Sequence, residues 1–240
     1  MKILKNFLKE EKPDVYGIST YVEKYVLFTS KIAEKLKLKY LPHEVAKKTT
    51  NKFYLYEFLR KKGLFKAKFN RYKLKDQKDF VENILSINKK EFILKPSNEA
   101  GSRGVIKIDE SLKNIKFLKN HFKYLKSIGV KEYLIMDYLD GDEFSIEGLV
   151  QNGKFHIVGI SEKFKLNGPF FIEKGDWSIP HSLNKKETDL IVNYLKKCLK
   201  ALKFNNCTFH AEIRFDKDGN PHLIDLGSRP GGDYIFLFCK

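Results

Sequence analysis

The chain has 240 residues, of which 42% are hydrophobic and 14% aromatic. This composition supplies enough apolar surface for a core, most simply as two lobes, and it excludes an intrinsically disordered chain. The N-terminal residues lack the apolar region of a signal peptide, and no apolar run is long enough to span a membrane. The three cysteines are odd in number and form no CxxC or Cys/His metal pattern. We therefore expect a reduced, cytoplasmic setting without membrane association.

The formal net charge of +16 raises the question of a nucleic-acid partner. Only five of the 46 basic residues are arginine, however, although arginine is preferred for bidentate contacts with phosphates and bases. The lysines are spread through nearly every segment, a distribution that is more typical of solvated faces than of a binding stripe. We therefore expect no nucleic-acid partner.

In chain order, the sequence predicts an alternation of strands and helices that belongs to the α+β class. A buried strand over 13–20, a helix over 22–38 and a short strand over 38–42 would form a single βαβ step. Further helices are predicted over 49–62, 75–87, 111–127 and 185–202, with Thr49 or Thr50 as the N-cap of the first. Further strands are predicted over 65–70, 91–96, 105–108, 132–139, 143–150, 154–164, 207–215 and 221–227.

The strongest local pattern is a hairpin over residues 207–227. Residues 216–220, Asp-Lys-Asp-Gly-Asn, are typical of a turn between two strands. Side chains alternate along a strand, so each strand presents three polar or glycine positions on one face. These are His210, Glu212 and Arg214 on the first strand, and Asp225, Gly227 and Arg229 on the second.

The register of this hairpin decides whether two carboxylates meet. If Phe215 pairs with His222, Glu212 lies opposite Asp225. Two opposed carboxylates repel each other unless a cation lies between them, and Mg²⁺ typically takes one or two protein carboxylates together with phosphate oxygens and water. The pattern therefore predicts a magnesium site. The alternative is that Glu212 pairs with Arg214 or with a lysine on a solvated sheet face.

Residues 91–108 predict a strand, a small polar loop and a second strand. Gly101 and Gly104, with Ser97 and Ser102, could expose backbone N–H groups to a phosphate, and Lys95 would add a positive charge. Neither GxxxxGK[ST] nor GxGxxG is present. Taken alone, such a loop is usually only a flexible turn.

Residues 132–150 predict two strands joined by a turn at Gly141. An extended segment before such a turn could offer backbone groups to the edge of a base, with a carboxylate nearby for ribose hydroxyls. Taken alone, it is an ordinary hairpin with an acidic tip.

The order of these pieces resembles the ATP-grasp superfamily, particularly its carboxylate–amine ligases. That group includes D-alanine–D-alanine ligase, glycinamide ribonucleotide synthetase, biotin carboxylase and the L-amino-acid ligases. The matching segments are TTNKFYLYEFLRKKGL, ILKPSNEAGSRGV, MDYLDGDEFSIEGLV, PFFIEKGDWSIP and HAEIRFDKDGNPHLIDLGSRPGGD. The separation of 13 residues between Glu212 and Asp225 is also typical of the family.

The resemblance implies an ATP-grasp fold of two β-rich α+β lobes, preceded by an incomplete Rossmann-like βαβ piece. Residues 1–48 would be the C-terminal remnant of a pre-ATP-grasp domain, and residues 49–240 the ATP-grasp domain. Within the latter, a lid subdomain would span about 66–135, and a larger metal-binding subdomain, truncated at its C-terminus, about 136–240.

The resemblance also implies ATP and Mg²⁺ as cofactors, with Mn²⁺ able to replace the magnesium. The implied nucleotide contacts are Lys52, Lys95, Ser97, Gly101, Ser102, Arg103, Gly104, Tyr138, Leu139 and Glu143. The two lysines would contact phosphates, residues 97–104 would close as a lid, Tyr138 and Leu139 would meet adenine through backbone groups, and Glu143 would hold the ribose. Glu212 and Asp225 would ligate the metal. Arg229 and Lys95 would be the catalytic residues, with Arg229 steadying the γ-phosphate or the acyl phosphate formed from it.

The activity implied is an ATP- and magnesium-dependent ligation, in which a small carboxylate becomes an acyl phosphate that an amine attacks, with release of ADP. The expected partners are small-molecule carboxylate and amine substrates, and a homodimer is an open alternative to a monomer.

The chain departs from the family at Gly227, where many relatives carry a metal-binding Asn, and at Asp225, where many carry Glu. Trp177 could wall the substrate pocket or pack in the core. Both ends are expected to be truncated, so the alternative is a non-catalytic ATP-binding remnant.

Overall fold

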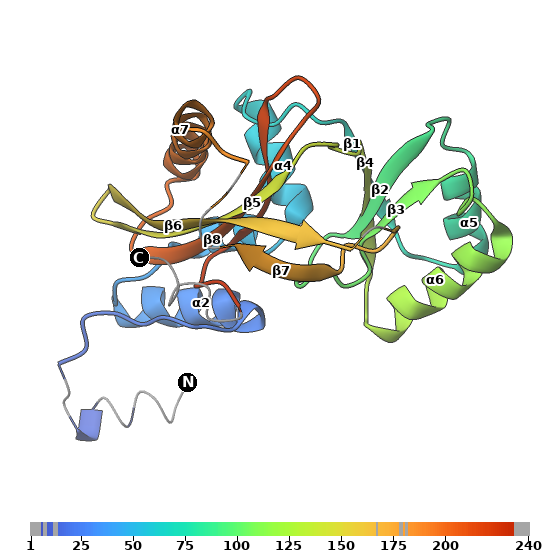
Figure 1. Cartoon of the computed structure of the whole chain (residues 1–240). Coiled ribbons are helices and arrows are strands. Elements are labelled where there is room, and N and C mark those ends of the chain that lie inside the picture. Colours follow the sequence, from blue (N-terminus) through green and yellow to red (C-terminus); the bar gives the residue numbers. More distant parts are fainter. Residues whose placement is uncertain are drawn as a thin grey trace.

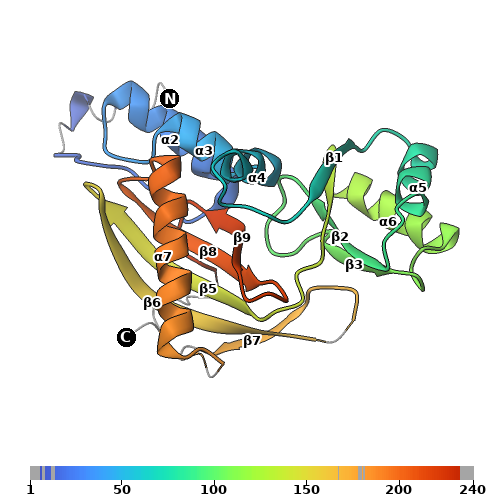
Figure 2. The same cartoon turned by 90° about the horizontal axis from the view of Figure 1, so that it is seen from above.

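The computed structural model describes residues 6, 9–11, 14–166, 168–177, 180 and 182–232. Two antiparallel sheets organise the chain: a four-stranded sheet of order β1-β4-β2-β3 and a five-stranded sheet of order β7-β6-β5-β8-β9. They form two lobes that lie side by side in both views (Figures 1 and 2). The predicted α+β class is confirmed. None of the described helices is long and apolar enough to cross a bilayer.

The smaller lobe packs two helices against one face of its sheet. Its elements are β1 (Phe69–Lys73), α5 (Gln77–Leu85), β2 (Glu91–Pro96), β3 (Ile106–Asp109), α6 (Ile115–Ser127) and β4 (Glu132–Met136). Alternation along β2 sends Phe92 and Leu94 into the core beneath the helices, whereas Ile93 joins the core of the other lobe. Lys95 follows Ile93 on that second face and is also buried. One face of the smaller sheet is therefore apolar and covered by α5 and α6, whereas the other face carries both apolar and charged side chains towards the larger lobe.

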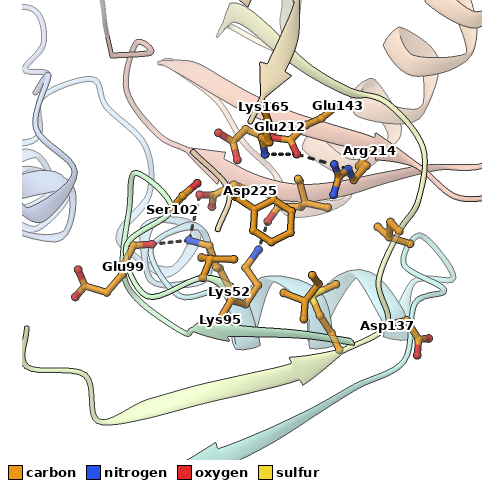
Figure 3. Close-up of a pocket in the computed structure, with 16 residues that line it drawn as sticks. Lys52, Lys95, Glu99, Ser102, Asp137, Glu143, Lys165, Glu212, Arg214 and Asp225 are labelled. Carbon is orange, nitrogen blue, oxygen red and sulfur yellow. Dashed lines mark hydrogen bonds and ion pairs between the residues drawn. The ribbon is translucent and has the colours of Figure 1, made fainter. Parts of the chain in front are cut away.

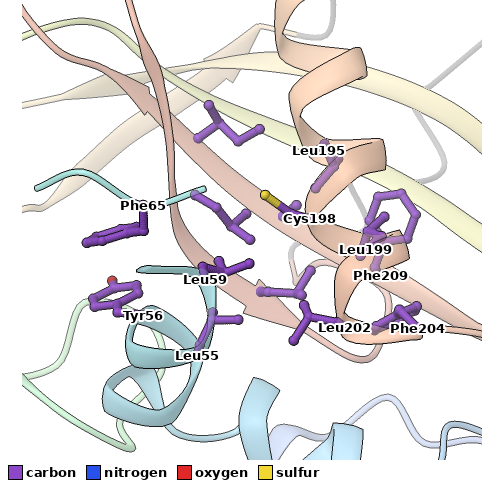
Figure 4. Packing of buried hydrophobic residues seen from close by; sticks show 14 of the residues in the cluster. Leu55, Tyr56, Leu59, Phe65, Leu195, Cys198, Leu199, Leu202, Phe204 and Phe209 are labelled. Carbon is purple, nitrogen blue, oxygen red and sulfur yellow. The ribbon is translucent and has the colours of Figure 1, made fainter. Parts of the chain in front are cut away.

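The larger lobe carries a single long helix on one face of its sheet. Its elements are β5 (Glu143–Gln151), β6 (Lys154–Lys165), β7 (Glu173–Trp177), α7 (Lys185–Leu202), β8 (Cys207–Phe215) and β9 (Pro221–Gly227). A capping box between Asn184 and Glu187 begins α7. Its apolar stripe packs on Phe209 and neighbouring side chains of the sheet (Figure 4). The opposite face of the same strands carries the polar side chains predicted for the hairpin.

The N-terminal part forms η1 (Glu23–Tyr25), α2 (Val26–Leu36), α3 (His43–Thr49) and α4 (Lys52–Lys61). The helix predicted over 49–62 thus begins later than expected. Its N-cap is Asn51 and neither threonine, because the Asn51 side chain accepts hydrogen bonds from the backbone N–H groups of Phe53 and Tyr54. The helix α4 lies between the lobes, where Tyr56 stacks on Phe65 with ring centroids 4.4 Å apart.

Several sequence predictions for the N-terminal segment and for the strands of the two lobes need correction. The predicted buried strand over 13–20 is not found: residues 14–17 and 19 are exposed, Ile18 and Thr20 are half-buried, and residue 13 lies outside the described residues. A single parallel bridge between Gly17 and Lys39 is the only pairing described there. The Rossmann-like piece is therefore not confirmed. The strand predicted over 65–70 begins at Phe69, and β4 ends at Met136, before the predicted 137–139. The helix α3 and the strand β7 were not predicted.

The hairpin of β8 and β9 has the predicted strands but a different register near its turn. Phe215 pairs with Pro221 and not with His222. A β-bulge then leaves Ile224 as an extra residue, and beyond it Glu212 pairs directly with Asp225. The expected Phe215–His222 pairing is wrong, but the bulge restores the pairing of the two carboxylates.

Asp216 holds the turn of this hairpin, so its loss should weaken the turn in a pH-dependent way. Oδ1 of Asp216 accepts hydrogen bonds from the backbone N–H groups of Asp218 and Asn220, both at 2.9 Å, and Oδ2 accepts one from Nε2 of His222, also at 2.9 Å. Partial burial acts to raise the pKa of Asp216, but the bonds from His222 and Asn220 lower it to about 2. Because the folded pKa is depressed, the stabilisation is present above the unfolded pKa of about 4 and is lost as the pH falls towards 2.

We expect Asp216→Asn to lower the free energy of unfolding by about 1 kcal/mol at neutral pH, with the difference from the wild type shrinking between about pH 4 and pH 2. Urea unfolding over a pH series measures this. Asp218→Asn changes the same charge in the same turn and should behave like the wild type. A pH-independent loss in Asp216→Asn would contradict the electrostatic account.

Candidate active site

A pocket lies between the two sheets, with its walls supplied by both lobes (Figure 3). The side chains around it are of two kinds. The apolar ones are Ile93, Val105, Met136, Leu139, Phe171 and Ile224. The charged ones are Lys52, Lys95, Glu99, Asp137, Glu143, Lys165, Glu212, Arg214 and Asp225, and Ser102 completes the lining. A pocket of mixed apolar and charged walls suits a ligand that has a flat apolar part and an anionic part.

The two carboxylates predicted to bind a metal lie side by side on adjacent strands, each facing a lysine. Nζ of Lys52 lies 3.1 Å from Oδ2 of Asp225, and Nζ of Lys163 lies 2.6 Å from Oε1 of Glu212. The side chains of Glu212 and Asp225 are 22% and 26% exposed, so both are open to the pocket. Within the described residues, no group of three or more His, Cys, Asp or Glu could hold a metal. Two open carboxylates fit Mg²⁺, which completes its shell with phosphate oxygens and water.

The alternative pairing considered for Glu212 is found only in part. Its partner is a lysine, Lys163, and not Arg214, and this lysine is buried at 3% exposure instead of lying on a solvated face. Nζ of Lys163 also lies 2.7 Å from Oε1 of Glu173. Burial would lower the pKa of Lys163, but Glu212 and Glu173 raise it well above its ordinary value, so the ammonium stays charged.

Glu212 is also held by an imidazole. Nε2 of His210 lies 3.5 Å from Oε1 of Glu212, and Nδ1 of His210 is hydrogen-bonded to Glu147. Burial acts to lower the pKa of His210, but Glu147 and Glu212 raise it to about 9. Burial acts to raise the pKa of Glu212, but Lys163 and His210 hold it well below its ordinary value. Glu212 is therefore an anion at neutral pH, with its charge available to a metal.

The loop between β2 and β3 reaches the carboxylate pair through Lys52. Nζ of Lys52 donates to the backbone oxygen of Glu99 at 2.8 Å, and the backbone N–H of Lys52 donates to the oxygen of Ser97 at 2.7 Å. Gly101, Ser102 and Gly104 have positive φ angles of 64°, 54° and 76°. A Cβ at Gly104 would lie 2.7 Å from Leu125, so that position requires glycine.

The structure brings some residues of this predicted loop to the pocket and not others. Ser102 lines the main pocket, and Gly101 lines the adjoining cavity next to Asp225. Arg103 and Gly104 line neither of these and lie instead along a separate groove that residues of α6 also line. Arg103 pairs with Glu99 at 2.9 Å. Ser97 is buried, and its hydroxyl has no hydrogen-bond partner among the described residues.

Lys95 lies at the floor of the pocket, where the bulge of β9 meets α4. Its Nζ donates to the backbone oxygen of Ile224 at 3.0 Å and to the Tyr56 hydroxyl at 2.9 Å. Burial lowers the pKa of Lys95, and the carboxylates of Asp225 and Glu212 act in the opposite direction. The bulge thus has a second effect, because the backbone oxygen of the extra residue, Ile224, accepts hydrogen bonds from both Lys95 and the Tyr56 hydroxyl.

The turn between β4 and β5 and the start of β5 supply Leu139 and Glu143 to the pocket. Oε2 of Glu143 lies 2.5 Å from Nζ of Lys165 and 3.7 Å from Nε of Arg214, whereas Oε1 is buried without a hydrogen-bond partner among the described residues. An unpaired buried acceptor of this kind can accept from a ligand hydroxyl. Tyr138 does not line this pocket; its ring lies beneath Nζ of Lys107 at 4.6 Å.

Sequence reasoning missed the contribution of β6 and the segment that follows it. Lys163 and Lys165 of β6 pair with Glu212 of β8 and Glu143 of β5, respectively. The centre of the Phe171 ring lies 5.0 Å from Nζ of Lys165 and 5.5 Å from Cζ of Arg214. The segment PFFIEKGDWSIP was recognised as a family match, but only Trp177 was considered in it, and the Trp177 side chain lies outside the described residues. The signal available was the alternation of Lys163 and Lys165 at the end of a predicted strand.

The loop after β9 is fixed by buried contacts. The backbone N–H of Gly231 donates to Oε2 of Glu147 at 3.0 Å, and the Ser228 hydroxyl lies 2.6 Å from that of Thr49. Nε of Arg229 lies 2.9 Å from Oε2 of Glu23, a residue of the N-terminal segment. Arg229 is thereby held beside the cavity that also contains Glu212 and Asp225.

Comparison with known proteins agrees with this geometry. Residues 88–236, more than half of the chain, match the model of the ATP-grasp domain, and the chain belongs to this family. The resemblance inferred from the sequence is thereby confirmed, and with it the ATP-grasp fold.

Two curated relatives and one solved structure show which proteins the chain resembles. The chain is 28% identical over 236 residues to an alanine–anticapsin ligase of Bacillus subtilis, covering 90% of this chain and 48% of the relative. It is 28% identical over 145 residues to a D-alanine–D-alanine ligase of Flavobacterium psychrophilum, covering 58% of this chain and 42% of the relative. Among solved structures, an L-amino acid ligase from Bacillus licheniformis superposes with a TM-score of 0.76 at 27% identity, covering 96% of this chain and 52% of the other. The chain therefore spans about half the length of the relatives it matches.

Two adjacent glycines after Arg229 allow a matched test of the loop. A Cβ at Gly231 would lie 2.5 Å from Oε1 of Glu147 and 2.8 Å from Nδ1 of His210, whereas a Cβ at Gly232 would meet nothing within 4 Å. Gly231→Ala should lower the free energy of unfolding by about 1–3 kcal/mol, because the buried pair must move. Gly232→Ala should stay within about 0.5 kcal/mol of the wild type in the same urea titration. Equal losses in both variants would show that the Glu147–His210 pair does not constrain the loop.

Proposed function

We propose that the pocket binds ATP together with Mg²⁺, and that the protein is an ADP-forming carboxylate–amine ligase. The observation that supports this most strongly is the direct pairing of Glu212 with Asp225 beside Lys52 and Lys95. In this arrangement, two anions can share a divalent cation while two lysines face the anionic part of the same ligand. Related chains are named as ligases of alanine or of amino acids, and the amine and carboxylate substrates are proposed for this chain on that basis.

In the proposed arrangement the apolar walls take the adenine. Ile93, Met136 and Leu139 line the pocket, and the backbone of residues 138 and 139 follows the end of β4 and is free of strand pairing. Glu143, with its unpartnered Oε1, would accept from a ribose hydroxyl. Lys52, Lys95 and the loop over residues 97–104 would contact the phosphates.

The proposed chemistry is largely electrostatic. A carboxylate that attacks the γ-phosphoryl group is an anion approaching an anion, so positive groups must screen both. A magnesium ion between Glu212 and Asp225 would supply part of this screening. Lys52 would leave Asp225 for a phosphate, and Arg229 would hold the γ-phosphate or the acyl phosphate formed from it. No nucleophilic side chain is needed.

We further propose that the smaller sheet and its helices, about residues 66–135, act as the lid, and that about residues 136–240 form the metal-binding part. The hydrogen bonds from Lys52 to Ser97 and Glu99 join the loop of the lid to α4, close to Asp225. A closed lid would keep water from the acyl phosphate until the amine arrives. The division at residue 48, the assembly as a monomer or homodimer, and the cytoplasmic setting stay predictions.

Replacing one carboxylate of the pair tests the metal assignment. Asp225→Asn keeps the shape of the side chain and removes its charge, so its affinity for ATP in the presence of Mg²⁺ should fall by at least about tenfold. With EDTA in place of Mg²⁺, the variant should bind ATP no more weakly than the wild type, because no metal is then shared. Calorimetric titration measures both, and Asp218→Asn at the hairpin turn is the matched control. An equal loss with and without Mg²⁺ would exclude a shared metal.

Turnover separates a ligase from the alternative of a non-catalytic remnant. With Mg²⁺ and ATP present, a ligase should release ADP only when both an acid and an amine are supplied, whereas a remnant would bind ATP and release none. A coupled ADP assay over amino acids, small carboxylates and amines measures this. Arg229→Lys retains the charge but not the planar fork, and we expect it to lower the rate at least about tenfold.

A further inference from the structure

A single extra residue on β9 decides on which face of the larger sheet Asp225 lies. From the hairpin turn as far as Ile213, β8 and β9 pair without interruption. Continued in that register, the ladder would place Ile224 opposite Glu212. Asp225 would then lie opposite Ala211, on the face that packs against α7. The bulge at Ile224 prevents this, and it brings Asp225 onto the same face as Glu212.

The backbone groups at this bulge are bound by two tyrosine hydroxyls. A bulge interrupts the ladder, and buried backbone groups beside it need other partners. The Tyr194 hydroxyl of α7 accepts a hydrogen bond from the backbone N–H of Leu223 at 3.0 Å. The Tyr56 hydroxyl of α4 donates to the backbone oxygen of Ile224, and Nζ of Lys95 donates to the same oxygen at 3.0 Å. Side chains of other elements therefore hold the bulge at both of its ends.

The Tyr194 hydroxyl acts on the site only through the backbone of β9. Its single proton is donated to the backbone oxygen of Leu64 at 2.8 Å, so it meets the Leu223 N–H as an acceptor. Leu223 is fully buried, and water therefore has no access to replace the hydroxyl. Among the described residues, those that line the pocket between the lobes and the cavity beside Asp225 do not include Tyr194.

From this arrangement we propose that Tyr194 is a positioning residue for the metal site, because it holds the bulge that keeps Asp225 beside Glu212; this rests on the proposed function. Without the hydroxyl, the N–H of Leu223 is buried and unpaired, which disfavours the bulged strand relative to other arrangements. In the uninterrupted register Asp225 leaves the face of Glu212, and the shared cation loses one of its two carboxylates.

Tyr56 supports the same geometry but has a second contact in the pocket. Its hydroxyl also accepts a hydrogen bond from Nζ of Lys95 at 2.9 Å, and Lys95 is proposed to contact the phosphates. Loss of the Tyr56 hydroxyl therefore disturbs both the bulge and this lysine. Loss of the Tyr194 hydroxyl leaves the contacts of Lys95 in place, so the two tyrosines predict different effects on metal-free nucleotide binding.

The experiment measures how much Mg²⁺ strengthens the binding of ATP. Calorimetric titration of the full chain gives the affinity for ATP with Mg²⁺ and with EDTA, and the ratio of the two is the gain due to the metal. Tyr194→Phe should reduce this gain at least about tenfold, the usual scale for residues that orient a metal ligand. Its affinity for ATP with EDTA should stay within about twofold of the wild type. Tyr56→Phe should also lose the gain, and it should bind ATP more weakly with EDTA.

A core variant of the same helix separates positioning from a general loss of stability. Leu202→Val shortens a buried side chain of α7 about 12 Å along the helix from Tyr194, and it should keep the full gain from Mg²⁺. The proposal is wrong if Tyr194→Phe keeps the gain, or if Leu202→Val loses as much of it. If circular dichroism shows that Tyr194→Phe does not fold, the gain in Tyr56→Phe decides in the same way. A wild type that gains nothing from Mg²⁺ would instead contradict the shared metal of the proposed function, and both proposals with it.

Discussion

The site depends on two like charges that the fold places opposite each other. Glu212 and Asp225 are paired neighbours on β8 and β9, and such a pair is destabilising unless cations lie nearby. The chain supplies these cations from two directions, Lys163 from β6 and Lys52 from the start of α4. The two lysines differ in kind. Lys163 is buried and shared with Glu173, whereas Lys52 also contacts the loop between β2 and β3, so that loop and Asp225 are linked through one ammonium group.

Sheet alternation explains how so many charges can lie beside a well-packed core. On β8, Phe209, Ala211 and Ile213 face the apolar stripe of α7, while His210, Glu212 and Arg214 lie on the other face. Across the sheet those three pair with Glu147, Ser145 and Glu143 of β5. Charged residues therefore face one another in neighbouring rows, and the pKa shifts of His210, Glu212 and Lys163 follow from this arrangement and not from any single contact. The apolar face stabilises the lobe by packing on α7, and the polar face supplies Glu212 and Arg214 to the pocket.

The N-terminal segment contributes to the site although it belongs to neither sheet. Tyr40 and Thr49 contact Ser228, which follows them by 188 and 179 residues, and Glu23 contacts Arg229. The loop after β9 is therefore held between the large sheet and the N-terminal segment. Glu147 and His210 hold the same loop from the sheet side. This double attachment fixes the position of Arg229 from two sides.

Local chemistry was sufficient to predict much of this from the sequence. The bounds of α7, β2, β8 and β9 agree with the predicted ranges, because a capping residue, an apolar period and a turn sequence are all properties of neighbouring residues. The pairing of Glu212 with Asp225 was also predicted, although through a register that a bulge at Ile224 corrects.

What the sequence could not show was which distant side chains meet this pair. Lys163 reaches Glu212 over 49 residues, and the strand order β7-β6-β5-β8-β9 that makes this possible is decided by packing. Lys52 reaches Asp225 because α4 packs between the lobes, and Glu23 reaches Arg229 because the N-terminal segment contacts the loop after β9. The hairpin's chemistry is thus local to its sequence, whereas the charges that balance it depend on the tertiary structure, since long-range ion pairs leave no periodic trace along the chain.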